Sequence, residues 1–118
     1  MESVGLALVG AGNIAQNIHL PLLSKMSGVR VMALCDKNLS KAKMIAERYG
    51  IPHVCRSIED LKKIEGIRAV DICASTDAHY EATMACIEHG MDVLVEKPLA
   101  RTSREAEALV NAAREHGT

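Results

Sequence analysis

A glycine-rich turn near the start of the chain has the spacing of a phosphate-binding loop. Residues 10–15 read Gly-Ala-Gly-Asn-Ile-Ala and fit the pattern G-x-G-x-x-A. In such a turn Gly10 permits the tight bend, Gly12 lets the backbone approach a pyrophosphate, and Ala15 allows a helix to pack closely on a strand. The helix that starts here offers free N–H groups to the anion. The alternative interpretation of the motif is a plain turn between a strand and a helix. The candidate cofactor contacts in this turn are Gly10, Gly12, Asn13 and Ile14.

Asp36 is the candidate for selecting the nucleotide. It follows the apolar stretch 29–35 and lies 24 residues after Gly12. An acidic residue at about this distance, at the end of the second strand, accepts hydrogen bonds from the adenosine ribose hydroxyls. Its charge repels a 2′-phosphate, which favours NAD over NADP, whereas the neighbouring cation of Lys37 weakens that discrimination. The alternative is an ordinary surface carboxylate at a strand end.

Lys97 is the candidate for acid–base chemistry. It follows the apolar stretch 91–95, and doubly wound sheets bind their ligands just beyond the carboxyl ends of the strands. A partly desolvated lysine next to a cofactor cation is suited to proton transfer. The alternative is a solvated lysine that precedes a turn at Pro98 and has no chemical role.

The elements that must position these residues are apolar stretches that alternate with helical ones. Pro21 falls inside the first helical stretch, from Asn13 to about Met26, and should kink or restart it. Continuously apolar strands that alternate with helices predict an α/β fold with a doubly wound parallel sheet of Rossmann type. We expect one dinucleotide-binding domain over residues 1–118, with five parallel strands and a truncated sixth. The expected strand stretches are 4–9, 29–35, 51–55, 69–74 and 91–95.

Composition narrows the function classes. The 118 residues are 48% hydrophobic and 25% charged, which is typical of one globular domain and excludes general disorder. A net charge of -1 and only two aromatic residues, both tyrosine, argue against a nucleic-acid partner. Without a long apolar run or a signal-like start, we expect a cytoplasmic protein and no membrane partner.

Neither the cysteines nor the remaining histidines have the spacing of metal ligands. The four cysteines form no C-x-x-C pair and indicate buried thiols in a reducing compartment. We expect no metal site, and we expect structural or solvent-facing roles for four histidines. These are His19, His53, His89 and His116.

The chain resembles the glucose–fructose oxidoreductase, inositol dehydrogenase and MocA (Gfo/Idh/MocA) group of oxidoreductases. The resemblance covers essentially the whole chain and includes the glycine turn, Asp36, and residues 70–76 (Val-Asp-Ile-Cys-Ala-Ser-Thr) followed by His79. Its most specific part is the Glu-Lys-Pro tripeptide within residues 93–100 (Val-Leu-Val-Glu-Lys-Pro-Leu-Ala). It implies hydride transfer between NAD(P) and a hydroxyl-bearing carbon of a sugar, cyclitol or similar small molecule.

The resemblance also implies roles for individual residues. Lys97 matches the lysine beside the nicotinamide and substrate that helps to polarise or deprotonate the reacting hydroxyl. Glu96 matches a residue near the nicotinamide ribose. Thr76 and His79 match the loop after the fourth strand that lines the cofactor, and Asp77 stands where many relatives have proline.

Two functions remain open at this stage. The first is the cofactor domain of an NAD-dependent dehydrogenase whose C-terminal substrate domain is absent from this chain, which alone would then be inactive. The second is a stand-alone dinucleotide-binding or sensing module without catalysis, and the Lys97 motif favours the first. A missing sixth strand would leave residues 91–95 as a bare apolar edge, so we expect a homo-oligomer.

Overall fold

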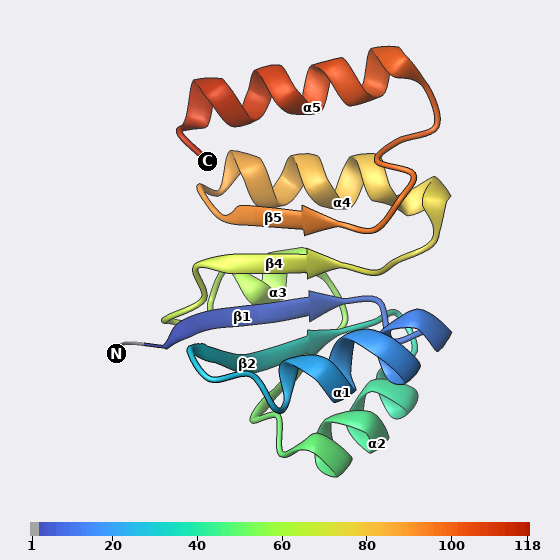
Figure 1. The fold of residues 1–118 in the computed structure, drawn as a ribbon, viewed down its shortest axis with the longest axis vertical. Helices are drawn as coiled ribbons and strands as arrows, with labels where there is room; N and C mark the ends of the chain where they lie inside the picture. The colour runs from blue at the N-terminus through green and yellow to red at the C-terminus, as the bar shows by residue number, and fades with distance from the viewer. Residues whose placement is uncertain (1–2) are drawn as a thin grey trace.

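Five parallel strands form one sheet in the computed structural model, which describes residues 3–118. Their spatial order is β3-β2-β1-β4-β5, as Figure 1 shows. This is the order of a doubly wound Rossmann sheet, so the predicted fold class is confirmed. The strands are β1 (Val4–Val9), β2 (Val29–Cys35), β3 (His53–Cys55), β4 (Ala69–Ile72) and β5 (Asp92–Val95).

Helices cover both faces of the sheet, and each face has its own core. Successive residues of a strand point to opposite faces, so Leu8 of β1 packs towards α1 and α2, whereas Val9 packs towards α3 and α4. Helix α5 lies beside α4 at one end of the molecule (Figure 1). The helical segments are η1 (Ala15–His19), α1 (Leu20–Leu23), α2 (Leu39–Tyr49), α3 (Ile58–Leu61), α4 (Thr76–Glu88) and α5 (Ser103–His116).

The neighbouring strands β1 and β4 form the switch point of this topology. The helical segments that follow β1 lie on one face of the sheet, and the helix that follows β4 lies on the other. The two chain crossings therefore diverge at the carboxyl ends of β1 and β4 and leave a crevice between them. Ligands of open α/β sheets bind in such a crevice.

Pro21 disturbs the first helix, as the sequence predicts. The helical run ends at Leu23 rather than near Met26. Before the proline the chain is wound as a π-helix, η1, in which the Leu20 N–H donates to the carbonyl of Ala15. A proline lacks an N–H and crowds the preceding turn, and the wider π-turn makes room for its ring.

Side chains cap the starts of two of the longer helices. Asn38 accepts a hydrogen bond from the Lys41 N–H at the start of α2, and Thr102 accepts one from the Glu105 N–H at the start of α5. The N-cap residue of α4 is Ser75, whose side chain makes no capping hydrogen bond. Over the described residues, no helix is long and apolar enough to span a membrane.

Candidate functional site

The two glycines of the turn after β1 have different physical reasons to be glycine. Gly10 has a φ of +96°, and a Cβ on it would lie 2.7 Å from the backbone nitrogen of Ala74. The fold itself therefore requires glycine at this position. A Cβ on Gly12 would meet no atom within 4 Å. Glycine at Gly12 instead leaves open space, which suits a position where an anion must approach the backbone closely.

A cleft of about 490 Å³ lies over this turn, at the switch point of the sheet. Gly10, Gly12 and Asp36 line one part of it, and Ser75 and Ala78 line another. The helical run that starts at Asn13 begins beside the cleft. Its first N–H groups have no acceptor within the helix, so they are available to an anion.

Asp36 is held firmly at the end of β2. Its Oδ2 accepts the Ala11 N–H at 2.7 Å, and its Oδ1 accepts the Asn38 N–H at 2.7 Å. A carboxylate has about four acceptor positions, so about two remain for ribose hydroxyls. The side chain thus joins the glycine turn to the start of α2 and faces the cleft that both elements line.

Three cations line the same end of the cleft. Lys37 was predicted from its place beside Asp36, whereas Lys41 of α2 and Arg56 of the β3–α3 loop were not. The Lys41 ammonium lies 3.9 Å from Asp36 Oδ2. Lys41 lies in the first turn of the helix that follows Asp36, a position that could have indicated it. Only the packing of β3 beside β2 brings Arg56 here.

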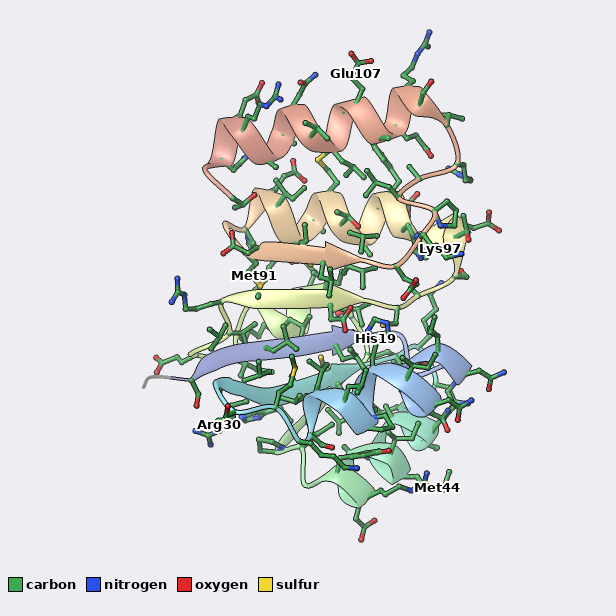
Figure 2. The ribbon with its side chains drawn as sticks, viewed as in Figure 1. His19, Arg30, Met44, Met91, Lys97 and Glu107 are labelled. Carbon is green, nitrogen blue, oxygen red and sulfur yellow. The ribbon has the colours of Figure 1, made fainter. Side chains whose placement is uncertain are left out.

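The Glu-Lys-Pro loop follows β5 at the same edge of the sheet. Lys97 is exposed, and its backbone N–H donates to Glu96 Oε1 at 3.2 Å. The peptide bond between Lys97 and Pro98 is cis. Figure 2 shows that Lys97 and His19 both lie on the side of the molecule where β1, β4 and β5 end.

His79 lies beneath the cleft rather than in its lining. The side chain is 2% exposed, with Nδ1 2.7 Å from the Pro98 carbonyl oxygen and Nε2 2.7 Å from that of Ala74. It thereby ties the start of α4 to the Glu-Lys-Pro loop. Thr76, the first residue of α4, is half-buried. The residues of this region that line the cleft are Ser75 and Ala78.

His19 is the main site residue that sequence reasoning did not single out. A structural or solvent-facing role was expected, and the structure excludes the solvent-facing one because the ring lies between two carboxylates. Its Nδ1 lies 2.5 Å from Asp71 Oδ2, and its Nε2 lies 2.8 Å from Glu96 Oε2. The Cys73 Sγ is 3.3 Å from the same Nδ1. One signal was available: His19 is four residues after Ala15, hence on the helix face that packs on the sheet.

The carboxylates change the protonation of this cluster. Burial lowers the pKa of His19, but hydrogen bonds and charges from Asp71 and Glu96 outweigh burial and raise it. The hydrogen bond from His19 in turn holds the pKa of Glu96 below its ordinary value. Burial, and then the charge of Asp71, raises the pKa of the Cys73 thiol. The cluster therefore favours a protonated imidazole, an ionised Glu96 and a neutral thiol.

Comparison with known proteins shows which family shares this fold. Residues 4–118 match the Gfo/Idh/MocA family, described as an oxidoreductase family with an NAD-binding Rossmann fold. The chain belongs to this family. The predicted resemblance is thus confirmed over nearly the whole length, and the domain is an NAD-binding Rossmann domain.

Two of its relatives are named for activity on a glucoside and on an inositol. The domain is 31% identical to D-glucoside 3-dehydrogenase of Escherichia coli K12, over 95% of this chain and 32% of that protein. It is 27% identical to scyllo-inositol 2-dehydrogenase (NADP(+)) IolW of Bacillus subtilis, over 99% of this chain and 32% of that protein. The chain therefore spans about a third of the length of these relatives.

Solved structures of two relatives have the same fold. The 3-ketoreductase KijD10 of Actinomadura kijaniata, in complex with NADP, superposes with a TM-score of 0.92 at 28% identity, over 98% of this chain and 37% of KijD10. GenD2 from gentamicin A biosynthesis, in complex with NAD, superposes with a TM-score of 0.94 at 27% identity, over 100% of this chain and 33% of GenD2. Domains of this shape accordingly occur with either dinucleotide.

Proposed function

We propose that this oxidoreductase domain binds a nicotinamide dinucleotide in the cleft at the switch point and presents it beside Lys97. The observation that supports this most is the contrast between the two glycines. The fold requires glycine at Gly10, whereas Gly12 faces open space beside the start of a helix. Gly12 lines the cleft, and a Cβ on it would meet no protein atom within 4 Å. This position is therefore suited to a ligand that must touch the backbone.

Each part of the proposed site binds a different part of the cofactor. Backbone N–H groups at Gly12, Asn13 and Ile14 hold the pyrophosphate, and Asp36 accepts hydrogen bonds from the adenosine ribose. Glu96 lies by the nicotinamide ribose. When bound, the nicotinamide ring supplies hydride acceptance or donation.

Lys97 is the proposed group that acts on the substrate. Its ammonium would polarise the reacting hydroxyl of a sugar, cyclitol or similar molecule, or take part in its deprotonation. The exposed position of Lys97 after β5 leaves the side chain free to meet a substrate. Groups that recognise the rest of the substrate would come from outside this domain.

We further propose that the domain prefers NAD and still accepts NADP. The carboxylate of Asp36 disfavours a 2′-phosphate, but Lys37, Lys41 and Arg56 line the same end of the cleft and attract it. Both oxygens of Asp36 also accept backbone N–H groups, which spreads part of its negative charge. The opposing charges predict a modest rather than an absolute preference.

Calorimetric titration of the domain with NAD and with NADP tests both statements. We expect saturable binding of both dinucleotides, with NAD the tighter ligand. Tighter binding of NADP would mean that the three cations outweigh Asp36. Binding of neither dinucleotide at millimolar concentration would contradict the proposed function.

A further inference from the structure

His19 lies between two carboxylates that come from different strands. Asp71 belongs to β4, Glu96 follows β5, and both ring nitrogens of His19 are within hydrogen-bond distance of them, at 2.5 Å and 2.8 Å. An ionised carboxylate can only accept hydrogen bonds, and a neutral imidazole has a single N–H. Both contacts can be hydrogen bonds to ionised carboxylates only if the ring carries two protons.

The burial of an ionised Asp71 favours a positive charge on this ring. The side chain is 1% exposed in the interior of the sheet, where an unpaired carboxylate is strongly unfavourable. The ion pair that the structure describes for Asp71 is with His19, and the Cys73 thiol is the further donor, 3.6 Å from Oδ1. An imidazolium therefore compensates a buried charge that a neutral ring would leave unpaired.

Glu96 extends the same chain of contacts to Lys97. One oxygen of Glu96 accepts from His19 at 2.8 Å, and the other accepts the Lys97 N–H at 3.2 Å. A continuous series of hydrogen bonds thus runs from the buried strand β4, through His19 and Glu96, to the backbone of Lys97. Figure 2 shows His19 inside the fold and Lys97 at the edge of the same side.

We propose that His19 is a positioning residue, whose doubly protonated ring clamps Glu96 to Asp71 and thereby holds the backbone of Lys97 in place. This inference rests on the proposed function only for the role of Lys97. Misplacing a reacting group by about 1 Å can cost on the order of 100-fold in rate. Holding Glu96 from inside the fold restricts the movement of the Lys97 backbone without bringing His19 into contact with the substrate.

A bound metal is the competing explanation of the cluster. Potential ligand atoms of His19, Asp71 and Cys73 lie within 4.8 Å of one another. His19 Nδ1 and Asp71 Oδ2 lie within hydrogen-bond distance of each other, so a shared proton accounts for their contact. A proton therefore explains the geometry better than a metal ion.

Nitrogen NMR of the ¹⁵N-labelled domain tests the clamp without cofactor or substrate. We expect the His19 ring to carry protons on both nitrogens near neutral pH. Glu96→Gln, which keeps the shape of the side chain, should lower the titration midpoint of His19 by about one pH unit or more, whereas Glu88→Gln on α4 should not change it. A neutral His19 ring near neutral pH, an unchanged midpoint in Glu96→Gln, or stoichiometric binding of Zn²⁺ by His19 would overturn the proposal.

Turnover of an enzyme that contains this domain tests the positioning role. We expect His19→Gln to lower kcat about 10-fold or more while the Kd for NAD changes less than about 3-fold. His53→Gln on β3 is the matched control and should leave kcat unchanged. An unchanged kcat in His19→Gln would refute the clamp even if NAD binds well. Conversely, a domain that binds no dinucleotide but shows the doubly protonated ring would refute only the proposed function.

Discussion

Two kinds of partner hold the carboxylates of this domain, and they respond differently to pH. Asp36 accepts hydrogen bonds from two backbone N–H groups, which do not titrate in the physiological range. Asp71 and Glu96 instead share one histidine, His19. The contacts of His19 should therefore depend on pH around neutrality.

The stability of the domain should decline as His19 loses its proton. The pKa of His19 is raised in the folded state, so its contribution to stability is complete below the unfolded-state value of about 6.5. The contribution is lost as pH rises through the raised value of the folded state. Urea unfolding at a series of pH values should show this decline in the wild type and less of it in His19→Gln. His53→Gln should retain the wild-type decline, and identical profiles for all three proteins would contradict this pH dependence.

Lys97 should matter for turnover more than for cofactor binding. In an enzyme that contains this domain, we expect Lys97→Ala to lower kcat by about 100-fold or more, the usual scale for losing a positioned acid–base group. The Kd for NAD should change much less. Lys25→Ala, another solvent-exposed lysine, controls for loss of a surface charge. Turnover that survives Lys97→Ala would favour a binding or sensing module.

Asp36 should control the choice between NAD and NADP. Asp36→Asn removes the charge and keeps one oxygen for the part-buried Ala11 N–H, whereas the exposed Asn38 N–H loses its acceptor and can bond to water instead. The fold should therefore tolerate the substitution at a small cost in stability. With Lys37 and Arg56 still in the cleft, we expect the ratio of NADP affinity to NAD affinity to rise about 10-fold or more. Asp77→Asn, an exposed residue of α4, should leave the ratio unchanged. A ratio that also stays constant in Asp36→Asn would show that this carboxylate does not select the nucleotide.

At the scale of elements, the turn between β1 and η1 separates the requirements of the fold from those of the ligand. Gly10→Ala places a Cβ against the backbone of Ala74 at a positive φ. We expect it to lower the free energy of unfolding by at least about 2 kcal/mol. Gly12→Ala meets open space and should change that free energy by less than about 1 kcal/mol.

The affinity for NAD should depend on Gly12 even though the stability of the fold depends on Gly10. Gly12→Ala should weaken NAD binding about 10-fold or more, because its methyl group enters the space where the pyrophosphate approaches the backbone. Thermal unfolding and calorimetry on both variants separate the two effects. Normal NAD binding by a stable Gly12→Ala variant would place the pyrophosphate elsewhere.

At the scale of the whole molecule, the sheet ends at β5 with backbone groups that no further strand pairs within residues 3–118. Leu94 of this strand is 62% exposed. Unpaired, apolar strand edges favour association between copies, so we expect the domain to self-associate in solution. Leu94→Lys should reduce the mass measured by light scattering. Met44→Lys, at the opposite end of the molecule in Figure 2, should not, and a monomer at high concentration would contradict the prediction.

The strand stretches, the glycine turn and the place of Asp36 could all be predicted from the sequence. Each depends on properties that are local in the chain: apolar runs, cap residues, and a glycine pattern directly between a strand and a helix. Local patterns were less reliable for helix ends, because the first helical run ends at Leu23 rather than near Met26. We predicted that His79 lines the cleft, whereas in the structure its side chain is buried beneath the cleft.

Only the tertiary structure decided which titratable groups meet. His19 lies 52 residues from Asp71 and 77 from Glu96 along the chain, and no local pattern records such distances. The parallel register of β1, β4 and β5 brings their ends together, and the π-turn at Pro21 lies in the helix that carries His19. A local pattern specifies which residues could do chemistry, whereas strand pairing and helix packing determine which of them share a proton.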